Sequence, residues 1–129
     1  MADLEKITIN MSVVDLGQID LLVEEGFYSN RADFIRTAIR NQLTQHSDAV
    51  KQSLTRKTTA LGVIDYSQRD LEGFRAVGEM VEIRVVGMLQ LNDDITPELA
   101  QATIKSIKVF GVLRASEALK QALADRLKN

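Results

Sequence analysis

The chain has 129 residues, a formal net charge of −2 and no cysteine, and it is 45% hydrophobic and 26% charged. These values are typical of a globular protein with one ordinary domain or two small ones. The lack of cysteine excludes disulfides and thiolate metal sites and agrees with a reducing cytoplasm. With one histidine (His46), we expect no metal and no cofactor. No apolar run approaches the ~20 residues of a membrane span, and no signal peptide is visible, so no membrane partner is expected.

The charge balance is unfavourable for a nucleic-acid-binding protein. Residues 1–50 carry four Lys or Arg residues against eight Asp or Glu residues. Non-specific affinity for DNA arises largely from cationic contacts with phosphates. A DNA-binding function would therefore depend on where the individual charges lie.

Residues 6–11, with the sequence Lys-Ile-Thr-Ile-Asn-Met, alternate polar and apolar side chains, which is the pattern of a strand with one buried face. Six residues cannot form a stable sheet alone, so we predict pairing with the same strand of a second copy, antiparallel across a twofold axis. The polar face of this ribbon would consist of Lys6, Thr8 and Asn10 from each chain. A two-stranded ribbon fits the DNA major groove, where such side chains can bond base edges.

Two helices are predicted after the ribbon. Ser12 suits an N-cap, and apolar residues recur at helical spacing until Gly26, which suits a left-handed helix end. A second start signal lies at Ser29, with Asp33 in the early turns. The apolar stripe that follows consists of Phe34, Ile35, Ala38, Ile39 and Leu43. Each helix is too short to bury its stripe alone, so an intertwined dimer is expected.

Residues 6–45 resemble the ribbon–helix–helix superfamily, in the manner of CopG-type bacterial regulators, with Arc and MetJ as more distant relatives. The resemblance lies in the strand at 6–11, in Ile-Asp-Leu-Leu-Val-Glu-Glu-Gly at 19–26, and in Phe-Tyr-Ser-Asn-Arg-Ala-Asp-Phe-Ile-Arg-Thr-Ala-Ile-Arg at 27–40. It implies an obligate, strand-swapped homodimer that binds double-stranded DNA. Carried onto this chain, the base-reading residues would be Lys6, Thr8 and Asn10. The phosphate-binding residues would be Ser29, Asn30 and Arg31.

The composition and motifs predict three segments. These are a ribbon–helix–helix domain at 1–46, a basic helical connector at 47–57 and a βαβαβα domain at 58–129. In the connector, the second helix either continues past Gln45 or is followed by a separate helix of about two turns that is capped by Ser47 or Asp48.

The second half contains three similar segments, at 60–64, 85–89 and 109–113, each with glycine at its centre. The glycines are Gly62, Gly87 and Gly111. Helix-start signals follow the segments at Ser67, Thr96 and Ser116. The last helix is predicted to extend over Leu119, Leu123 and Leu127. We therefore predict a threefold strand–helix repeat with a small parallel sheet, and a mixed α/β fold for the whole chain.

Right-handed crossovers would place all the helices of this repeat on one face of the sheet. The covered face should carry Ile64, Ile83, Val85, Leu89, Ile107, Val109 and Leu113. The opposite face is also apolar and consists of Leu61, Val63, Val86, Met88, Phe110 and Val112. Because parallel sheets are usually buried on both faces, we predict that this face packs against a partner copy, with ligand binding as the alternative. The second domain would then mediate oligomerisation or bind an effector of unknown identity.

These observations favour a cytoplasmic, DNA-binding transcriptional repressor that forms a homodimer or a higher homo-oligomer and is nucleoid-associated when bound. No catalytic set is visible, because Asp93-Asp94 is a lone acidic pair suited to a turn, so we expect no enzyme. Two alternatives remain open at this stage. One is a self-assembling scaffold in which the ribbon–helix–helix unit is only a dimer clasp, and the other is an antitoxin.

Overall fold

The computed structural model describes residues 4–128, and within them the chain is mixed α/β with six helices and one four-stranded sheet. The helices are α1 Val13–Glu24, α2 Arg31–Gln45, α3 Ser47–Arg56, α4 Gln68–Ala76, α5 Pro97–Thr103 and α6 Glu117–Ala122. The strands are β1 Ala60–Tyr66, β2 Val81–Leu91, β3 Ile104–Arg114 and β4 Leu127–Lys128. The chain divides between residues 51 and 52, inside α3, into two compact units. Within 4–128, no helix is both long and apolar enough to cross a membrane.

The first helix begins and ends as its sequence predicts. The Ser12 side chain accepts a hydrogen bond from the Asp15 N–H at 3.1 Å, which caps the N-terminus of α1. At the other end, Gly26 has φ of +88°, in the left-handed region. The N–H groups of Gly26 and Phe27 bond the carbonyls of Val23 and Leu22 at 3.1 and 3.0 Å, which is the Schellman pattern.

The second helix begins two residues later than its start signal at Ser29. Asn30 is the N-cap, and its side chain accepts from the Asp33 N–H at 2.8 Å. Either residue type suits a cap, and the geometry assigns Ser29 to the position before it. The connector alternatives are resolved as well, because α2 ends at Gln45 and α3 begins separately at Ser47.

The second unit is an all-parallel sheet in the order β1-β2-β3-β4, with one helix between each pair of successive strands. The three predicted helix caps are confirmed, since side-chain oxygens of Ser67, Thr96 and Ser116 accept hydrogen bonds at the starts of α4, α5 and α6. Ser67 and Asp70 form a complete capping box. Asp94, expected to serve a turn, accepts from the N–H of Gln68 at 3.0 Å.

The core of this unit lies between the sheet and its helices. Its buried members are Leu71, Ile83, Val85, Leu89, Leu91, Ile95, Leu99, Ala100, Ile104, Ile107, Leu119 and Leu123. The seven residues predicted for the covered face all belong to this core or pack against it. The face assignment therefore follows from strand alternation, as the sequence indicated.

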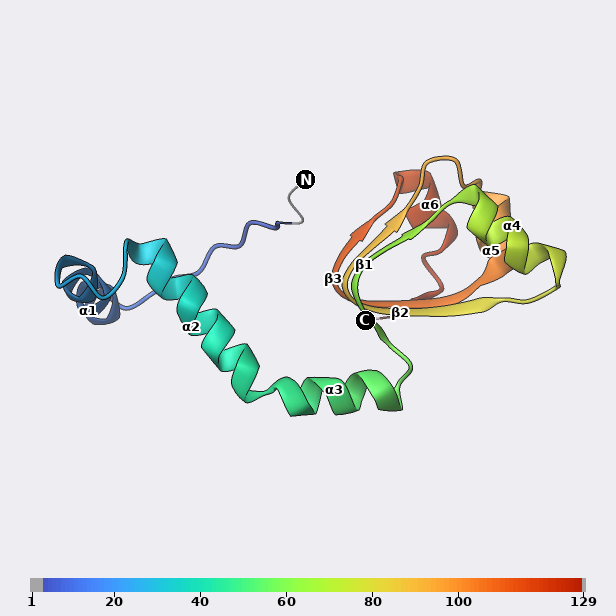
Figure 1. Ribbon diagram of the computed structural model, residues 1–129. Coiled ribbons are helices and arrows are strands. Elements are labelled where there is room, and N and C mark those ends of the chain that lie inside the picture. Colours follow the sequence, from blue (N-terminus) through green and yellow to red (C-terminus); the bar gives the residue numbers. More distant parts are fainter. Residues whose placement is uncertain (1–3, 129) are drawn as a thin grey trace. The chain divides into compact units, whose positions relative to one another are not determined.

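The three long strands curve together, and α4, α5 and α6 lie on the inside of the curve (Figure 1). Gly62, Gly87 and Gly111 form one registered row across the sheet and have φ values of 131°, 130° and 130°. A positive φ within an extended strand turns the backbone and strongly favours glycine. We therefore attribute the curvature to this glycine row.

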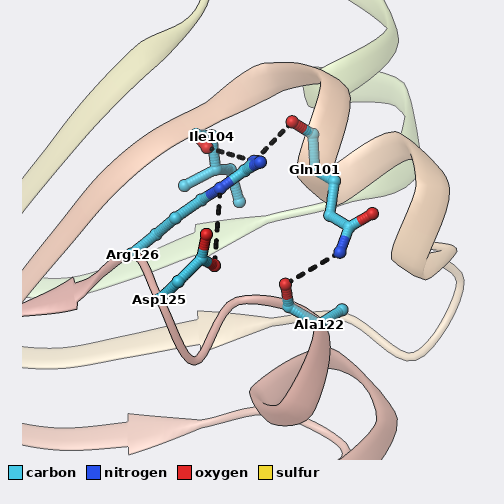
Figure 2. A network of polar contacts seen from close by, with 5 residues as sticks. All are labelled: Gln101, Ile104, Ala122, Asp125 and Arg126. Carbon is cyan, nitrogen blue, oxygen red and sulfur yellow. Dashed lines mark hydrogen bonds and ion pairs between the residues drawn. The ribbon is translucent and has the colours of Figure 1, made fainter.

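The end of the chain departs from the predicted βαβαβα pattern. The last helix stops at Ala122, and Leu127 lies in β4, a fourth strand that pairs with Ile107 and Lys108. The turn before β4 is fixed by Arg126, whose guanidinium donates to the carbonyls of Gln101 and Ile104 (Figure 2). The helical expectation for Leu127 was wrong because these bonds and the pairing with β3 override the local apolar spacing.

Replacing Arg126 by alanine should destabilise the second unit. The change leaves two carbonyls at the α5–β3 junction without a charged donor, and bonds of that kind contribute about 1.5–3 kcal/mol each. We expect the free energy of unfolding in urea to fall by about 2 kcal/mol. Arg75→Ala, which removes an exposed arginine from α4, is the matched control and should change stability by less than about 0.5 kcal/mol. Equal effects of the two changes would contradict the assigned role of Arg126.

Candidate nucleic-acid interface

The predicted ribbon is extended but unpaired in the single chain. Residues 4–11 form no strand, because a strand is defined by a neighbour and none of the described residues pairs with this segment. The polar set Lys6, Thr8 and Asn10 is exposed. The apolar side chains of Ile7 and Ile9, expected in a core, are 77% and 64% exposed. Both faces of the segment therefore lack cover within one chain.

The helices that follow do not form a closed core either. In the first unit, Ile19 is the one residue of the described part that is fully buried. The large hydrophobic residues left exposed are Leu4, Ile7, Ile9, Val13, Val14, Leu21, Phe27, Ile39, Leu43 and Val50. A hollow of about 340 Å³ lies among Met11, Asp15, Gln18, Ile19, Leu22 and Phe34. Exposed apolar surface on this scale is typical of an interaction surface rather than of a monomer.

The predicted phosphate-binding residues Ser29, Asn30 and Arg31 lie together at the start of α2. Two of them are held by Asp33. The Ser29 N–H and hydroxyl donate to the Asp33 carboxylate at 2.9 and 3.2 Å, and the Asn30 side chain accepts from the Asp33 N–H. These bonds fix the shape of the turn, and they also place a negative charge beside it.

Arg31 is engaged by a second carboxylate. Its Nε and one terminal nitrogen donate to the two oxygens of Asp20, each at 2.8 Å, so the pair is bidentate. The hydrogen bond from Arg31 lowers the pKa of the Asp20 carboxyl. Asp20 is therefore ionised at neutral pH and neutralises the arginine that the resemblance assigned to phosphate binding.

Asp20 and Asp33 were not identified as site residues from the sequence. Asp33 was placed only as an early helix residue, and the spacing of three from an Asn cap was the available signal. Asp20 lies eleven residues from Arg31, across the turn between helices, so helical spacing rules give no sign of the contact. Both carboxylates bear on how strongly this turn can bind an anion.

In the second unit, the predicted oligomer face forms two registered rows on the outer face of the sheet. One row is Leu61, Val86 and Phe110, and the other is Val63, Met88 and Val112. The rows flank the glycine row on either side. Leu61, Val63 and Phe110 are 66%, 45% and 48% exposed, and the three others are half-buried. No helix or strand of the described part of the second unit covers this face as a layer.

Among residues 4–128, no group of three or more His, Cys, Asp or Glu side chains is placed to hold a metal ion. What the chain presents instead is an extended polar–apolar segment, two short helices joined by a Schellman turn, and an attached α/β unit. This order of elements is that of a ribbon–helix–helix module followed by an additional domain.

The family model described as the Ribbon-Helix-Helix transcriptional regulator family matches residues 2–120, and the chain belongs to that family. The resemblance found in the first half of the sequence is thereby confirmed, and the match extends through most of the second half. Membership supports a DNA-binding transcriptional regulator, and such regulators are typically dimers.

A curated relative adds little to this assignment. The chain is 39% identical over 49 residues to "Uncharacterized protein MJ1679" of Methanocaldococcus jannaschii, and the match covers 38% of this chain and 50% of that protein. The chain thus spans about half the length of the curated relative it matches. The chain matches no solved structure with significance.

Proposed function

We propose that the protein is a sequence-specific DNA-binding repressor that acts as a strand-swapped homodimer. The observation that carries this proposal is the state of residues 6–11 in the single chain. Their apolar side chains, Ile7 and Ile9, are exposed, and so are Lys6, Thr8 and Asn10, which alternate with them in the sequence. Pairing with a second copy would bury Ile7 and Ile9 and would present the polar side chains on the outer face of one ribbon.

Each polar residue of the ribbon has a distinct role in this proposal. Asn10 can bond adenine in a bidentate manner, and Lys6 can donate to the acceptors of guanine. Thr8 can bond a base edge or contact the methyl group of thymine. The twofold axis repeats these contacts on two half-sites, so the operator should have matching symmetry. A repressor of this kind occupies a promoter, and we propose that the protein represses its own.

Phosphate contacts would come from the turn before α2. The helix α2 is fifteen residues long, and Ser29, Asn30 and Arg31 lie at its N-terminus, where helix N–H groups can bind an anion. Arg31 would exchange Asp20 for a DNA phosphate, or share its guanidinium between them. The acidic neighbours Asp20 and Asp33 would keep this contact weak, which favours specific over non-specific binding.

We further propose that the second unit, a threefold strand–helix repeat, mediates oligomerisation through its outer apolar rows. Six apolar side chains in register, three of them exposed, are a self-complementary surface of the kind that twofold interfaces use. Assembly would hold two ribbons on neighbouring half-sites of cytoplasmic DNA. The same unit is where an effector of unknown identity would act.

The test of the regulator is competition between two DNA duplexes. Purified protein is titrated with its own upstream DNA and with a scrambled duplex of equal composition, at ~50 and ~200 mM salt. We expect a preference for the upstream DNA that persists at the higher salt, because base contacts do not depend on counterion release. If the upstream and the scrambled duplex bind with equal affinity at each salt concentration, the protein does not repress its own promoter.

Replacing Asp20 by asparagine should strengthen DNA binding. The change releases Arg31 from its ion pair and removes one negative charge from each chain. We expect several-fold tighter binding at ~50 mM salt and a smaller gain at ~200 mM, because the added contact is electrostatic.

Glu24→Gln is the matched control, since it makes the same charge change on α1 at a carboxylate that forms no ion pair with Arg31. Comparison of the two variants by titration with one duplex separates the release of Arg31 from the change of net charge. A gain for Asp20→Asn no larger than that for Glu24→Gln would exclude Arg31 from the phosphate contact.

A scaffold is the second candidate function. The acidic balance of the first fifty residues and the exposed outer rows of the sheet both favour assembly over DNA binding. In that case the ribbon would serve only as a dimer clasp. Met88→Asp would reduce either assembly to ribbon-linked dimers, but only a DNA-binding regulator would retain operator affinity per dimer.

A further inference from the structure

The parallel sheet of the second unit ends in two unlike edges. At one edge stands β1, whose outer side pairs with no strand among residues 4–128. At the other edge, β4 pairs with only two residues of β3, Ile107 and Lys108. Beyond them, the outer side of β3 from Val109 to Leu113 also lacks a paired strand in the described chain. Exposed edges of this kind are templates for a further strand.

The backbone groups at the two edges have the spacing that a parallel pair requires. The Tyr66 carbonyl accepts from the Asn92 N–H, which lies at the end of β2, so Asp65 and Val63 direct their N–H and C=O groups outward. On β3, the Ile107 N–H donates outward to the Arg126 carbonyl at 2.9 Å. The same alternation directs the groups of Val109, Gly111 and Leu113 outward.

The glycine row makes the two edges complementary. A Cβ atom on Gly87 would overlap the carbonyl oxygen of Gly62, and a Cβ atom on Gly111 would overlap that of Gly87. The Gly62 carbonyl oxygen therefore lies where a side chain on Gly87 would be, and the Gly87 carbonyl oxygen lies where a side chain on Gly111 would be. At Gly62 this space is open, with no heavy atom within 4 Å. At the opposite edge, the Gly111 carbonyl oxygen would point toward the next strand, as the Gly62 and Gly87 carbonyl oxygens do within the sheet.

The lengths of the edges match as well. If the glycine row continues, Gly111 lies opposite Gly62 of a second copy, and Val109 lies opposite Ala60 of that copy. Ala60 is the first residue of β1, and Val109 is the first residue of β3 beyond the pair with β4. Residues 60–65 of β1 would then lie opposite the six residues of β3 that follow the pair with β4, from Val109 to Arg114.

We propose that β1 of one copy adds in parallel to the outer edge of β3 of another copy, with Gly62 opposite Gly111. This inference rests on the proposed role of the second unit in assembly, and it is independent of DNA reading. The added strand would bring Leu61 of one copy beside Phe110 of the other, which are two of the most exposed apolar side chains of the sheet. The contact is head-to-tail, so it links copies into rings or open chains rather than closed pairs.

The test uses cysteine cross-linking, for which the cysteine-free chain is a clean background. Val63 and Val112 occupy the same row of the outer face on β1 and β3. Within one copy they are two strands apart, roughly 10 Å, which is too far for a disulfide. In the proposed contact, Val63 of one copy and Val112 of the next lie opposite each other on adjacent strands, about 5 Å apart.

Under mild oxidation, the double variant Val63→Cys/Val112→Cys should form a covalent ladder of three and more chains in a denaturing gel. Each single variant alone should remain uncross-linked, and a mixture of the two singles should give a covalent pair. A ladder that stops at two chains, no cross-link at all, or efficient cross-linking of Val63→Cys alone would overturn the proposed edge contact.

Met88→Cys separates this contact from the face-to-face packing proposed above. Met88 lies in the same row but on the central strand β2, away from both edges. Face-to-face packing about a twofold axis along the strands would bring Met88 of two copies together and cross-link that single variant. Cross-linking of Met88→Cys therefore reports on face-to-face packing and not on the edge contact. Either contact can be disproved while the other is retained.

Discussion

The double variant Thr8→Ala/Asn10→Ala is expected to bind the operator at least 100-fold more weakly than the natural protein. Each base-reading side chain contributes about 1–3 kcal/mol of discrimination, and the twofold axis doubles the loss. Four contacts are lost per dimer, so even the low end of the range, about 4 kcal/mol, exceeds the about 2.7 kcal/mol of a 100-fold weakening. Non-specific binding should change little, because both side chains are uncharged. The measurement is a titration of labelled operator in parallel with a scrambled duplex.

Oligomeric state is the necessary companion measurement. The replaced side chains lie on the polar face of the ribbon, so light scattering should give the same mass for the variant as for the natural protein. Asn41→Ala/Thr55→Ala makes the same chemical change at exposed positions of α2 and α3 and should leave operator affinity intact. Unchanged operator affinity in Thr8→Ala/Asn10→Ala would remove the ribbon from the reading of DNA.

Gly87→Ala should destabilise the second unit by about 3 kcal/mol or more. An alanine there has φ of +130° and a Cβ atom that overlaps the Gly62 carbonyl. The backbone strain alone costs about 1–3 kcal/mol, and a backbone oxygen in a paired strand cannot move away as a flexible side chain could. Urea denaturation followed by far-ultraviolet circular dichroism measures the effect.

Gly73→Ala provides a control of opposite sign. Gly73 lies in α4, has no heavy atom within 4 Å of a Cβ position, and has no positive φ. Alanine in a helix is about 1 kcal/mol more favourable than glycine, so this variant should be more stable than the natural protein. If both variants lose stability equally, the glycine row does not have the structural role assigned to it.

Local signals in the sequence predicted much of the fold. The caps at Ser12, Ser67, Thr96 and Ser116 and the left-handed Gly26 were identified because each signal depends on neighbours within four residues. The assignment of residues to the two faces of the sheet followed from the alternation of side chains along each strand. The family resemblance in the first half rested on the same short-range patterns and is confirmed by the family match.

Features that depend on distant residues were missed. β4 has two residues, too few to show alternation, and its turn depends on Arg126 meeting carbonyls more than twenty residues away. The ion pair of Asp20 with Arg31 crosses the turn between two helices. The three glycines were recognised as a repeat. Their positive φ values, and their alignment in one row across β1, β2 and β3, are visible only in the structure.

The phosphate-binding role of Ser29, Asn30 and Arg31 stays a prediction. The structure places these residues at the start of α2, where they bond to Asp20 and Asp33, and sequence spacing gave no reason to expect the contact with Asp20. Residues 4–11 form no strand in the single chain, and the paired ribbon stays a prediction. The base-reading role of Lys6, Thr8 and Asn10 therefore stays a prediction.

The most direct test of sequence-specific reading is selection of duplexes from a random library by the purified protein, with Thr8→Ala/Asn10→Ala selected in parallel. We predict that the natural protein enriches one sequence with twofold symmetry and that the variant enriches none. Enrichment of no sequence by the natural protein, or of the same sequence by the variant, would contradict the claim that the ribbon reads DNA.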